Sequence, residues 1–249
     1  MKNKENKFEN YIEGRNAVTE SLRSGKPIDR IYILDGCQDG PVQSIKRDAR
    51  KKDIEIKYVE KSRLDNMSET GHHQGVIAVT AAYEYASVDD ILKRAEEKGE
   101  KPFIIVLDGI EDPYNLGAII RTANLAGAHG VIIREDRAAH LSAGVARASA
   151  GAINYTPVAK VSNISRTIED LKNKGIWFYC ADMDGISIYD TDMTGAVGIV
   201  IGNEGSGVSR LVREKCDHVI SLPVKGEIES LNASVAAGII AYEVVRARR

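Results

Sequence analysis

The sequence has few of the residues that mark exported, disulfide-bonded or membrane proteins. Only three of its 249 residues are cysteines, Cys37, Cys180 and Cys216, and no two of them have the spacing of a redox motif or a metal site. No apolar run approaches the roughly 18 residues that cross a bilayer, and the start of the chain lacks the apolar core of a signal peptide. We therefore expect a globular protein of a reducing cytoplasm, neither exported nor membrane-bound.

A surplus of positive charge is also missing. The 34 lysines and arginines are balanced by 36 aspartates and glutamates, which excludes a globally basic nucleic-acid-binding protein. RNA binding would need a local patch, and the basic run at 46–52 is a candidate, although a solvated helix face is the simpler interpretation. The histidines lack the spacing of metal ligands, so no metal is expected.

Two regions of different composition are present, joined by a charged segment. Residues 8–83 alternate a short helix at 14–25 with strands at 31–34, 54–59 and 75–80, which predicts a small α/β domain. Residues 84–101 open with a helix cap at Ser87 and continue as a charged run, so we interpret them as an exposed helical connector.

Longer apolar segments follow in residues 102–249. Strands are predicted at 103–107, 130–133, 176–180, 197–201 and 218–222, and helix-like stretches lie between them. Strands that are apolar on both faces and alternate with helices indicate a parallel sheet covered on both sides. The last helix, from about Leu231, is apolar around most of its circumference, which fits either a buried central helix or one that meets a second subunit.

Unusual polar residues follow three of these strands. In the first segment, residues 107–124, Asn115 and Arg121 stand outside the apolar stripe of a predicted helix, although Asn115 could simply cap that helix. Ligands bind at the carboxyl edge of open parallel sheets, and this is the edge where the segment lies. We therefore expect a site there.

The second and third segments lead to the same edge. The turn Gly202–Gly207 matches neither the dinucleotide fingerprint nor the phosphate loop, and Glu204 would repel a bound polyphosphate. Glycines that supply positive φ to a tight turn would explain the turn equally simply. Ser230, Asn232 and Ser234 crowd the start of the last helix, where Ser230 could be the cap.

Together these motifs carry a resemblance. Asn115 with Arg121, the turn Gly202–Gly207, and Ser230 with Asn232 resemble the three successive motifs of the SpoU/TrmH family of RNA ribose 2′-O-methyltransferases, over about residues 103–246. Residues 8–83, with the stretch Gly71–Val76, are similar to the small ribosomal-protein-like RNA-binding domain of many members. The most similar subgroup modifies a guanosine of large-subunit (23S) ribosomal RNA.

The resemblance implies a fold and a cofactor. The expected fold is a SPOUT domain, a parallel sheet whose C-terminal part forms a trefoil knot. The turn Gly202–Gly207 and the loop at 222–231 would hold S-adenosylmethionine. This donor has a sulfonium and an adenosine but no phosphate, which agrees with a glycine turn that carries a carboxylate. The expected cofactor-binding residues are Gly202, Asn203, Gly205, Leu222 and Leu231.

The resemblance also implies catalytic residues: Asn115, Arg121, Glu204, Ser230 and Asn232. In the family, the arginine that matches Arg121 is commonly given the role of the base that deprotonates the ribose hydroxyl. Arginine has a pKa of roughly 12.5 or more, so only about one part in 10⁵ would be neutral at pH 7 without strong desolvation. In the alternative hypothesis Arg121 stays charged, holds a phosphate and lowers the pKa of the ribose hydroxyl by its field.

The sequence therefore predicts a cytoplasmic homodimeric enzyme that uses S-adenosylmethionine to methylate a ribose 2′-hydroxyl in structured RNA, with the site completed across the dimer. Two alternatives remain for its function: a tRNA ribose methyltransferase, or an RNA-binding protein without turnover. A nucleotide-dependent enzyme is disfavoured because the phosphate fingerprint is missing.

Overall fold

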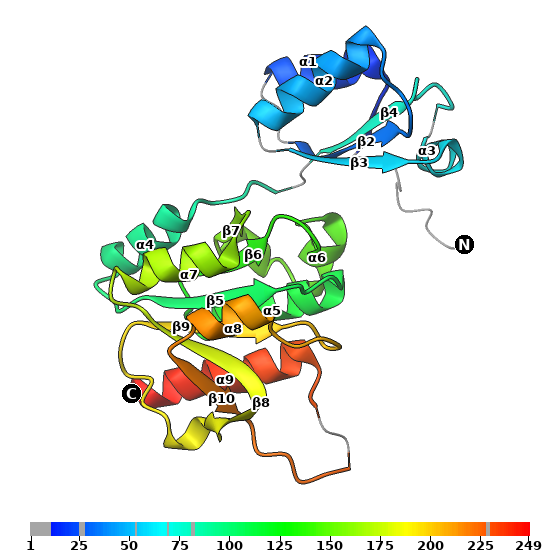
Figure 1. Ribbon diagram of the computed structural model, residues 1–249. Helices are drawn as coiled ribbons and strands as arrows, with labels where there is room; N and C mark the ends of the chain where they lie inside the picture. The colour runs from blue at the N-terminus through cyan, green and yellow to red at the C-terminus, as the bar shows by residue number, and fades with distance from the viewer. Residues whose placement is uncertain (1–10, 25–27, 53, 69, 81–82, 228–229) are drawn as a thin grey trace. The chain divides into compact units, whose positions relative to one another are not determined.

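The computed structural model describes residues 11–24, 28–52, 54–68, 70–80, 83–227 and 230–249. The chain divides between Glu84 and Tyr85 into two compact units (Figure 1). The expected helix stop at Gly25 lies outside the described residues. Within those residues, no helix combines the length and the apolar character needed to span a membrane.

The first unit is a four-stranded sheet with helices on both faces. Its strands run in the order β1 (Tyr11–Glu13), β4 (Val76–Thr80), β2 (Ile28–Leu34) and β3 (Glu55–Val59). Only β2 and β3 pair in parallel, and the other two pairs are antiparallel. Helices α1 (Arg15–Ser24) and α2 (Gly40–Lys51) pack on one face, and the short α3 (Lys61–Met67) packs on the other.

Successive side chains of β2 point to opposite faces of the sheet and pack against different helices. Ile31 and Ile33 lie in the core under α1 and α2, whereas Tyr32 packs with Ile77 and Leu64 on the side of α3. Successive side chains of a strand point to opposite faces, so a single strand contributes to two cores. The α/β character predicted for this part of the chain is confirmed, with β1 as an additional strand.

The second unit contains the predicted parallel sheet. Six strands pair in parallel throughout, in the order β10 (His218–Ser221), β8 (Trp177–Ser187), β9 (Val197–Gly202), β5 (Phe103–Asp108), β6 (Gly130–Arg134) and β7 (Val158–Val161). Five of the six were predicted. Strand β7 was missed because it is a short edge strand with Lys160 at its centre, so its sequence shows no apolar run.

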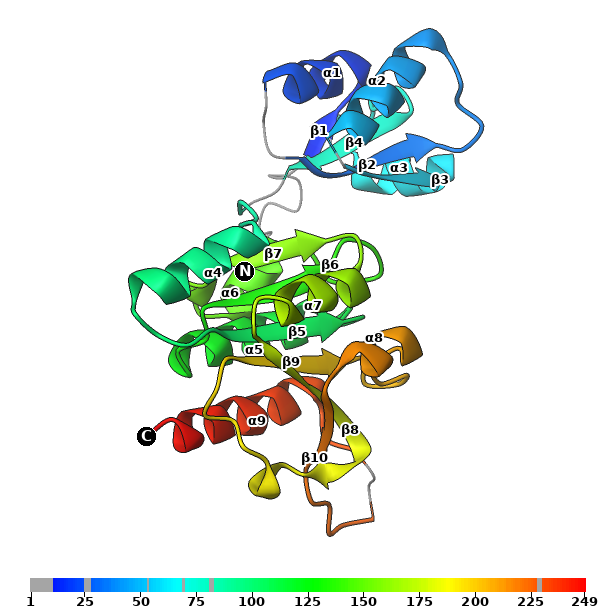
Figure 2. The same cartoon turned by 60° about the vertical axis from the view of Figure 1, so that its left-hand side comes forward.

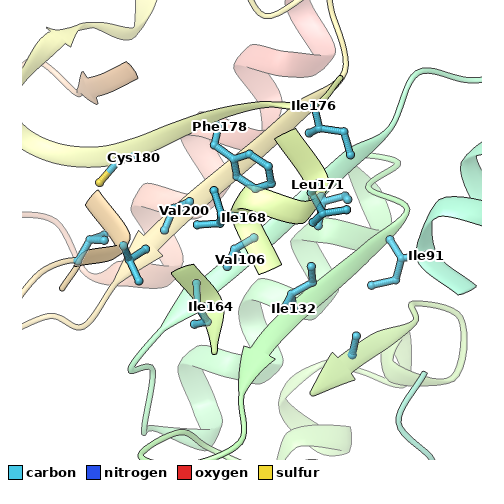
Figure 3. Close-up of a cluster of buried hydrophobic side chains, with 14 residues drawn as sticks. Ile91, Val106, Ile132, Ile164, Ile168, Leu171, Ile176, Phe178, Cys180 and Val200 are labelled. Atoms are coloured by element: carbon cyan, nitrogen blue, oxygen red, sulfur yellow. The ribbon is translucent and has the colours of Figure 1, made fainter. Parts of the chain in front are cut away.

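Helices cover both faces of this sheet. One face carries α4 (Val88–Glu97), α7 (Ile164–Lys172) and α8 (Arg210–Lys215), and the other carries α5 (Pro113–Leu125), α6 (Ala143–Ala148) and α9 (Ala233–Ala247) (Figures 1 and 2). Figure 3 shows the core on the first face, where Ile168 and Leu171 of α7 meet Val106, Val200 and Phe178 of the sheet. The burial of both faces explains why these strands are apolar on both sides.

Helix α4 is part of the second unit. Its Ile91 is fully buried in the core of Figure 3, and a Cβ added to Gly130 of β6 would lie 2.5 Å from Ile91 Cγ1. The expectation of an exposed connector at 84–101 therefore does not hold for α4. Most residues of α4 are charged, and only Ile91 and Ala95 form a narrow apolar stripe, which packs on the sheet.

A buried histidine ties β5 to β6. His129 is fully buried, and its ring Nδ1 accepts the backbone N–H of Phe103 at 3.0 Å. The backbone N–H of His129 donates to the Phe103 carbonyl at 2.8 Å. Because a backbone N–H can only donate, Nδ1 carries no proton, and Nε2–H donates to Glu100 at 3.0 Å. Burial lowers the pKa of His129, and the hydrogen bond that His129 donates to Glu100, together with the negative charge of Glu100, opposes that effect only in part.

This depressed pKa makes stability depend on pH. The folded protein favours neutral His129, so its contribution is complete above about pH 6.5 and is lost as pH falls towards the lower pKa of the folded state. We expect His129→Gln to reduce the free energy of unfolding by about 2 kcal/mol at pH 7.5, and by less at pH 5. Urea unfolding followed by the fluorescence of Trp177, the single tryptophan, reports on this unit.

His72→Gln is the control, because His72 is exposed and lies in the first unit. A difference between wild type and His129→Gln that grows as the solution becomes more acidic would contradict this account.

Candidate active site at the carboxyl edge of the sheet

Adjacent strands bring the candidate residues to one edge. In the pairing of β5 with β9, Asp108 stands opposite Gly202, and each is the last residue of its strand. Helix α5 begins at Pro113, soon after β5, and the glycine turn follows β9 directly. The carboxyl ends of parallel strands are where open α/β sheets bind ligands.

Three side chains from the three segments meet in one hydrogen-bonded cluster, the Asn–Glu–Asn triangle. Glu204 Oε1 accepts from Asn115 Nδ2 at 3.1 Å and from Asn232 Nδ2. Asn232 Nδ2 also donates to Asn115 Oδ1 at 3.0 Å. The predicted residues Asn115, Glu204 and Asn232 are therefore neighbours, although 89 positions separate the first two and 28 separate the last two.

Helix α9 contributes its N-terminus to the triangle. Glu204 Oε1 also accepts the Ala233 N–H at 3.3 Å, and a carboxylate at this end of a helix is stabilised by the exposed amides and the helix dipole. Asn232 is the N-cap, because its Oδ1 accepts from Ser234 N at 3.0 Å and from Val235 N at 3.3 Å. One asparagine thus caps α9 and binds Glu204.

The simpler interpretations of two residues do not hold. Asn115 does not cap α5: Asp112 is the N-cap and accepts from Tyr114 N at 3.0 Å, whereas Asn115 is only 8% exposed inside the triangle. Ser230 is not the cap of α9, because Asn232 has that position, and Ser230 lies exposed two residues earlier. Asp112 therefore caps α5 and Asn115 belongs to the triangle, whereas at the start of α9 Asn232 has both roles.

The turn after β9 is built on close backbone packing. A Cβ on Gly202 would lie 2.1 Å from the carbonyl carbon of Gly207, so only glycine fits there. Asn203 and Gly207 exchange two backbone hydrogen bonds, and Gly207 has a φ of 66°. Both glycines thus support the tight-turn interpretation: Gly207 supplies the positive φ, and Gly202 allows the close approach of its backbone to Gly207.

Asn203 holds this turn in place with its side chain. Its Oδ1 accepts the Gly205 N–H at 2.8 Å, and its Nδ2 donates to the Gly109 carbonyl at 2.8 Å. The turn is therefore closed internally and bonded to the loop that follows β5. Gly205 and Gly207 are exposed and leave backbone accessible along its rim.

The remaining predicted residues lie outside the triangle. Arg121 is exposed on α5, and its guanidinium forms no hydrogen bond or ion pair with the residues described. Leu222 is half-buried just after β10, and Leu231 is exposed next to the cap Asn232. Residues 228 and 229 of the predicted cofactor loop lie outside the described part of the chain.

Two residues of this edge were not predicted. Asp108 is buried, and its Oδ2 accepts the Ser209 N–H at 2.8 Å, which fixes the far end of the turn. Gly109, with a φ of 82°, provides the carbonyl that binds Asn203. An Asp-Gly pair directly after an apolar strand was the available signal, since such a pair ends a strand and starts a turn.

Groups of three or more His, Cys, Asp and Glu side chains placed to hold a metal ion do not occur in the described ranges. The polar groups at this edge are amides, serine hydroxyls, backbone groups and the carboxylates of Asp108 and Glu204. Such a set can bind and orient a polar organic ligand.

Comparison with known proteins identifies relatives along the whole chain. Residues 102–242 match the SpoU rRNA Methylase family, and residues 11–86 match the RNA 2′-O ribose methyltransferase substrate binding domain. A Bacillus subtilis protein assigned to the TrmH family of tRNA/rRNA methyltransferases is 48% identical over 96% of each chain.

Solved structures show the same similarity. The SpoU methyltransferase AviRb of Streptomyces viridochromogenes, in complex with the cofactor AdoMet, has a TM-score of 0.61 and 26% identity, covering 96% of this chain and 90% of its own. A TrmH/SpoU tRNA modifying enzyme of A. aeolicus has a TM-score of 0.55 and 30% identity, covering 64% of this chain and 83% of its own.

The triangle predicts a large effect of Glu204 on stability. Glu204→Ala leaves the buried Asn115 amide without its acceptor and removes the carboxylate from the start of α9, so we expect the free energy of unfolding to fall by about 2 kcal/mol. Urea unfolding monitored at Trp177 measures the change. Glu214→Ala is the matched control, because Glu214 forms only an exposed pair with Arg210 and should change stability by less than about 0.5 kcal/mol. Equal effects of the two substitutions would show that the triangle is not structurally important.

Proposed function

Because the chain belongs to the SpoU rRNA methylase family, we propose that it methylates the ribose 2′-hydroxyl of a guanosine in large-subunit (23S) ribosomal RNA, with S-adenosylmethionine as methyl donor. Family membership supplies the general activity, S-adenosylmethionine-dependent methylation of RNA ribose. The observation that carries the proposal is the triangle, in which Asn115, Glu204 and Asn232 join the three family motifs at one edge of the sheet.

The residues of the glycine turn fit the methyl donor. The turn offers exposed backbone and no cation between Gly202 and Gly207 that could bind a phosphate, and its carboxylate is held by Asn115 and Asn232. A ligand with a sulfonium and an adenosine but no phosphate suits this chemistry. When bound, S-adenosylmethionine supplies an electrophilic methyl group.

We assign its binding to Gly202, Asn203, Gly205, Leu222 and Leu231. In this assignment Asn203 acts by shaping the turn, because both of its side-chain polar atoms already have partners within the protein.

We assign the charged role to Arg121. Its guanidinium is exposed and has no ion-pair or hydrogen-bond partner among the described residues, so it is free to meet an anionic group. In this proposal Arg121 binds the phosphate beside the target ribose and lowers the pKa of the 2′-hydroxyl through its positive field. Asn115, Ser230 and Asn232 orient the ribose, and Glu204 holds the two asparagines.

Exposed apolar side chains support the proposed homodimer. Val235, Ile239 and Tyr242 follow one another along one side of α9, and all three are exposed. Helix α5 packs beside them on α9, where a Cβ on Gly238 of α9 would lie 3.7 Å from Thr122 of α5. Leu125, also on α5, is exposed as well. We propose that a second copy covers this surface and completes the site. The trefoil knot and the cytoplasmic location remain part of the proposal, as expected for the fold and the family.

The relatives include a tRNA modifying enzyme and a protein assigned to tRNA/rRNA methylation, so the RNA is the part of the proposal that most needs a test. Ribose methylation would be mapped across ribosomal and transfer RNA from cells that lack the protein. We expect one 2′-O-methylguanosine of 23S ribosomal RNA to be lost, and to be restored by the wild-type protein but not by Arg121→Ala. A lost tRNA site would favour the alternative substrate, and unchanged methylation would favour a binding-only protein.

Replacement of Arg121 by lysine tests the charged role. Lysine keeps the charge but not the planar fork, so we expect Arg121→Lys to lower the methylation rate roughly tenfold or more, with no new pKa in the pH–rate profile. The measurement is methyl transfer from labelled S-adenosylmethionine to RNA of the deletion strain, from pH 6 to 9.

Arg166→Lys is the control, because Arg166 is an exposed arginine on α7, on the opposite face of the sheet, and should keep the wild-type rate. Wild-type turnover by Arg121→Lys with a lowered kinetic pKa would show that residue 121 acts as the base.

A further inference from the structure

The first unit contains a pocket that none of the site residues uses. It lies between helix α3 and strands β1 and β2, elements labelled in Figure 2, and its volume is about 440 Å³. Six residues line it: Tyr11, Tyr32, Ser62, Arg63, Asn66 and Met67.

The pocket exists because α3 is too short to cover its face of the sheet. Seven residues form α3, and Leu64 is the one that is buried against Tyr32 and Ile77. Tyr11 and Met67 are only partly buried at the edge of this small core. The half-buried Tyr11 and Met67 are thus left beside open space, which the largely buried Tyr32 also lines.

The lining has the chemistry that recognises a nucleobase. The guanidinium of Arg63 lies over the Tyr32 ring, 5.7 Å from its centroid, and the Tyr11 ring provides a second aromatic surface. Aromatic rings and arginine planes stack on bases, and the donors and acceptors of Asn66 and Ser62 can pair with base edges. About 440 Å³ is within the usual range for small-ligand sites.

Charge favours the same class of ligand. Arg63 is the one charged residue among the six, and its guanidinium has no ion-pair partner in the part of the chain that the structure describes. A cation at the rim can therefore receive a backbone phosphate while the rings hold a base.

We propose that this pocket binds an unpaired nucleobase of the substrate RNA. The proposal rests on the function proposed above, and it adds that the first unit reads a single-stranded or flipped-out nucleotide. A base inside a duplex is stacked on both sides and cannot enter such a pocket, so paired RNA is excluded.

Met67 allows a direct test in the full-length protein. The chain has four methionines, and with ¹³C-methyl-labelled methionine the Met67 signal, assigned through Met67→Leu, reports on the pocket. The buried Met193 of the second unit is the internal reference. The probes are oligoadenylate, oligouridylate, a blunt RNA duplex of the same length, and free AMP.

We expect the single strands to shift the Met67 signal at lower concentration than AMP, and the duplex to leave it unchanged. A signal that responds to AMP but not to the strands, that responds equally to the duplex, or that responds to no probe would overturn the proposal.

Substitutions in the pocket separate stacking from charge. Tyr11→Leu keeps apolar bulk but removes the ring, and Arg63→Gln removes the cation, and we expect each to weaken single-strand binding roughly tenfold or more. Tyr58→Leu is the matched control, because Tyr58 is an exposed tyrosine of β3 that lies under Lys46 of α2, on the other face of the sheet. Thermal unfolding of each variant verifies its fold, and wild-type affinity in folded Tyr11→Leu and Arg63→Gln would overturn the proposal.

The outcome stays distinct from that of the proposed function. Methylation of cellular RNA without any Met67 response would overturn the pocket alone. A normal Met67 response in a protein that methylates no RNA would overturn the proposed function, and with it the substrate to which the pocket is assigned.

Discussion

The candidate site depends on the hydrogen bonds that the carboxylate of Glu204 accepts. This carboxylate accepts hydrogen bonds from Asn115, from Asn232 and from the first amide of α9, and so it joins three chain segments. A buried amide without an acceptor costs about 1–3 kcal/mol, so the buried Asn115 needs this partner. The same contacts leave Glu204 with little freedom to act as a base, so its observed role is to organise the candidate site.

Close backbone packing is the second constraint, and it complements the first. Gly202 touches Gly207 through main-chain atoms, and Asn203 bonds the loop after β5, so the turn keeps its shape without a ligand. Preorganised backbone suits the recognition of a cofactor whose adenosine and sulfonium offer no phosphate to grip. Arg121, by contrast, is exposed and has no partner among the described residues, so the candidate site combines a preformed turn with an exposed cation.

Much of this arrangement could be predicted from the sequence, and the failures have physical reasons. Long apolar runs identified five strands of the parallel sheet, whereas β7 is an edge strand interrupted by Lys160. The charged composition of α4 concealed Ile91, which packs in the core. Motif residues could be named one by one, but the bond between Asn115 and Glu204 depends on how segments 89 positions apart are folded, and no local pattern contains that information.

The triangle also sets an order of events during protein synthesis. Asn115 and Glu204 leave the ribosome before Asn232, so the carboxylate lacks one of its partners until the start of α9 has emerged. The first unit has no such dependence, since its sheet is complete once β4 has been made. A nascent chain can therefore hold a finished first unit while the candidate site at the sheet edge of the second unit is still open.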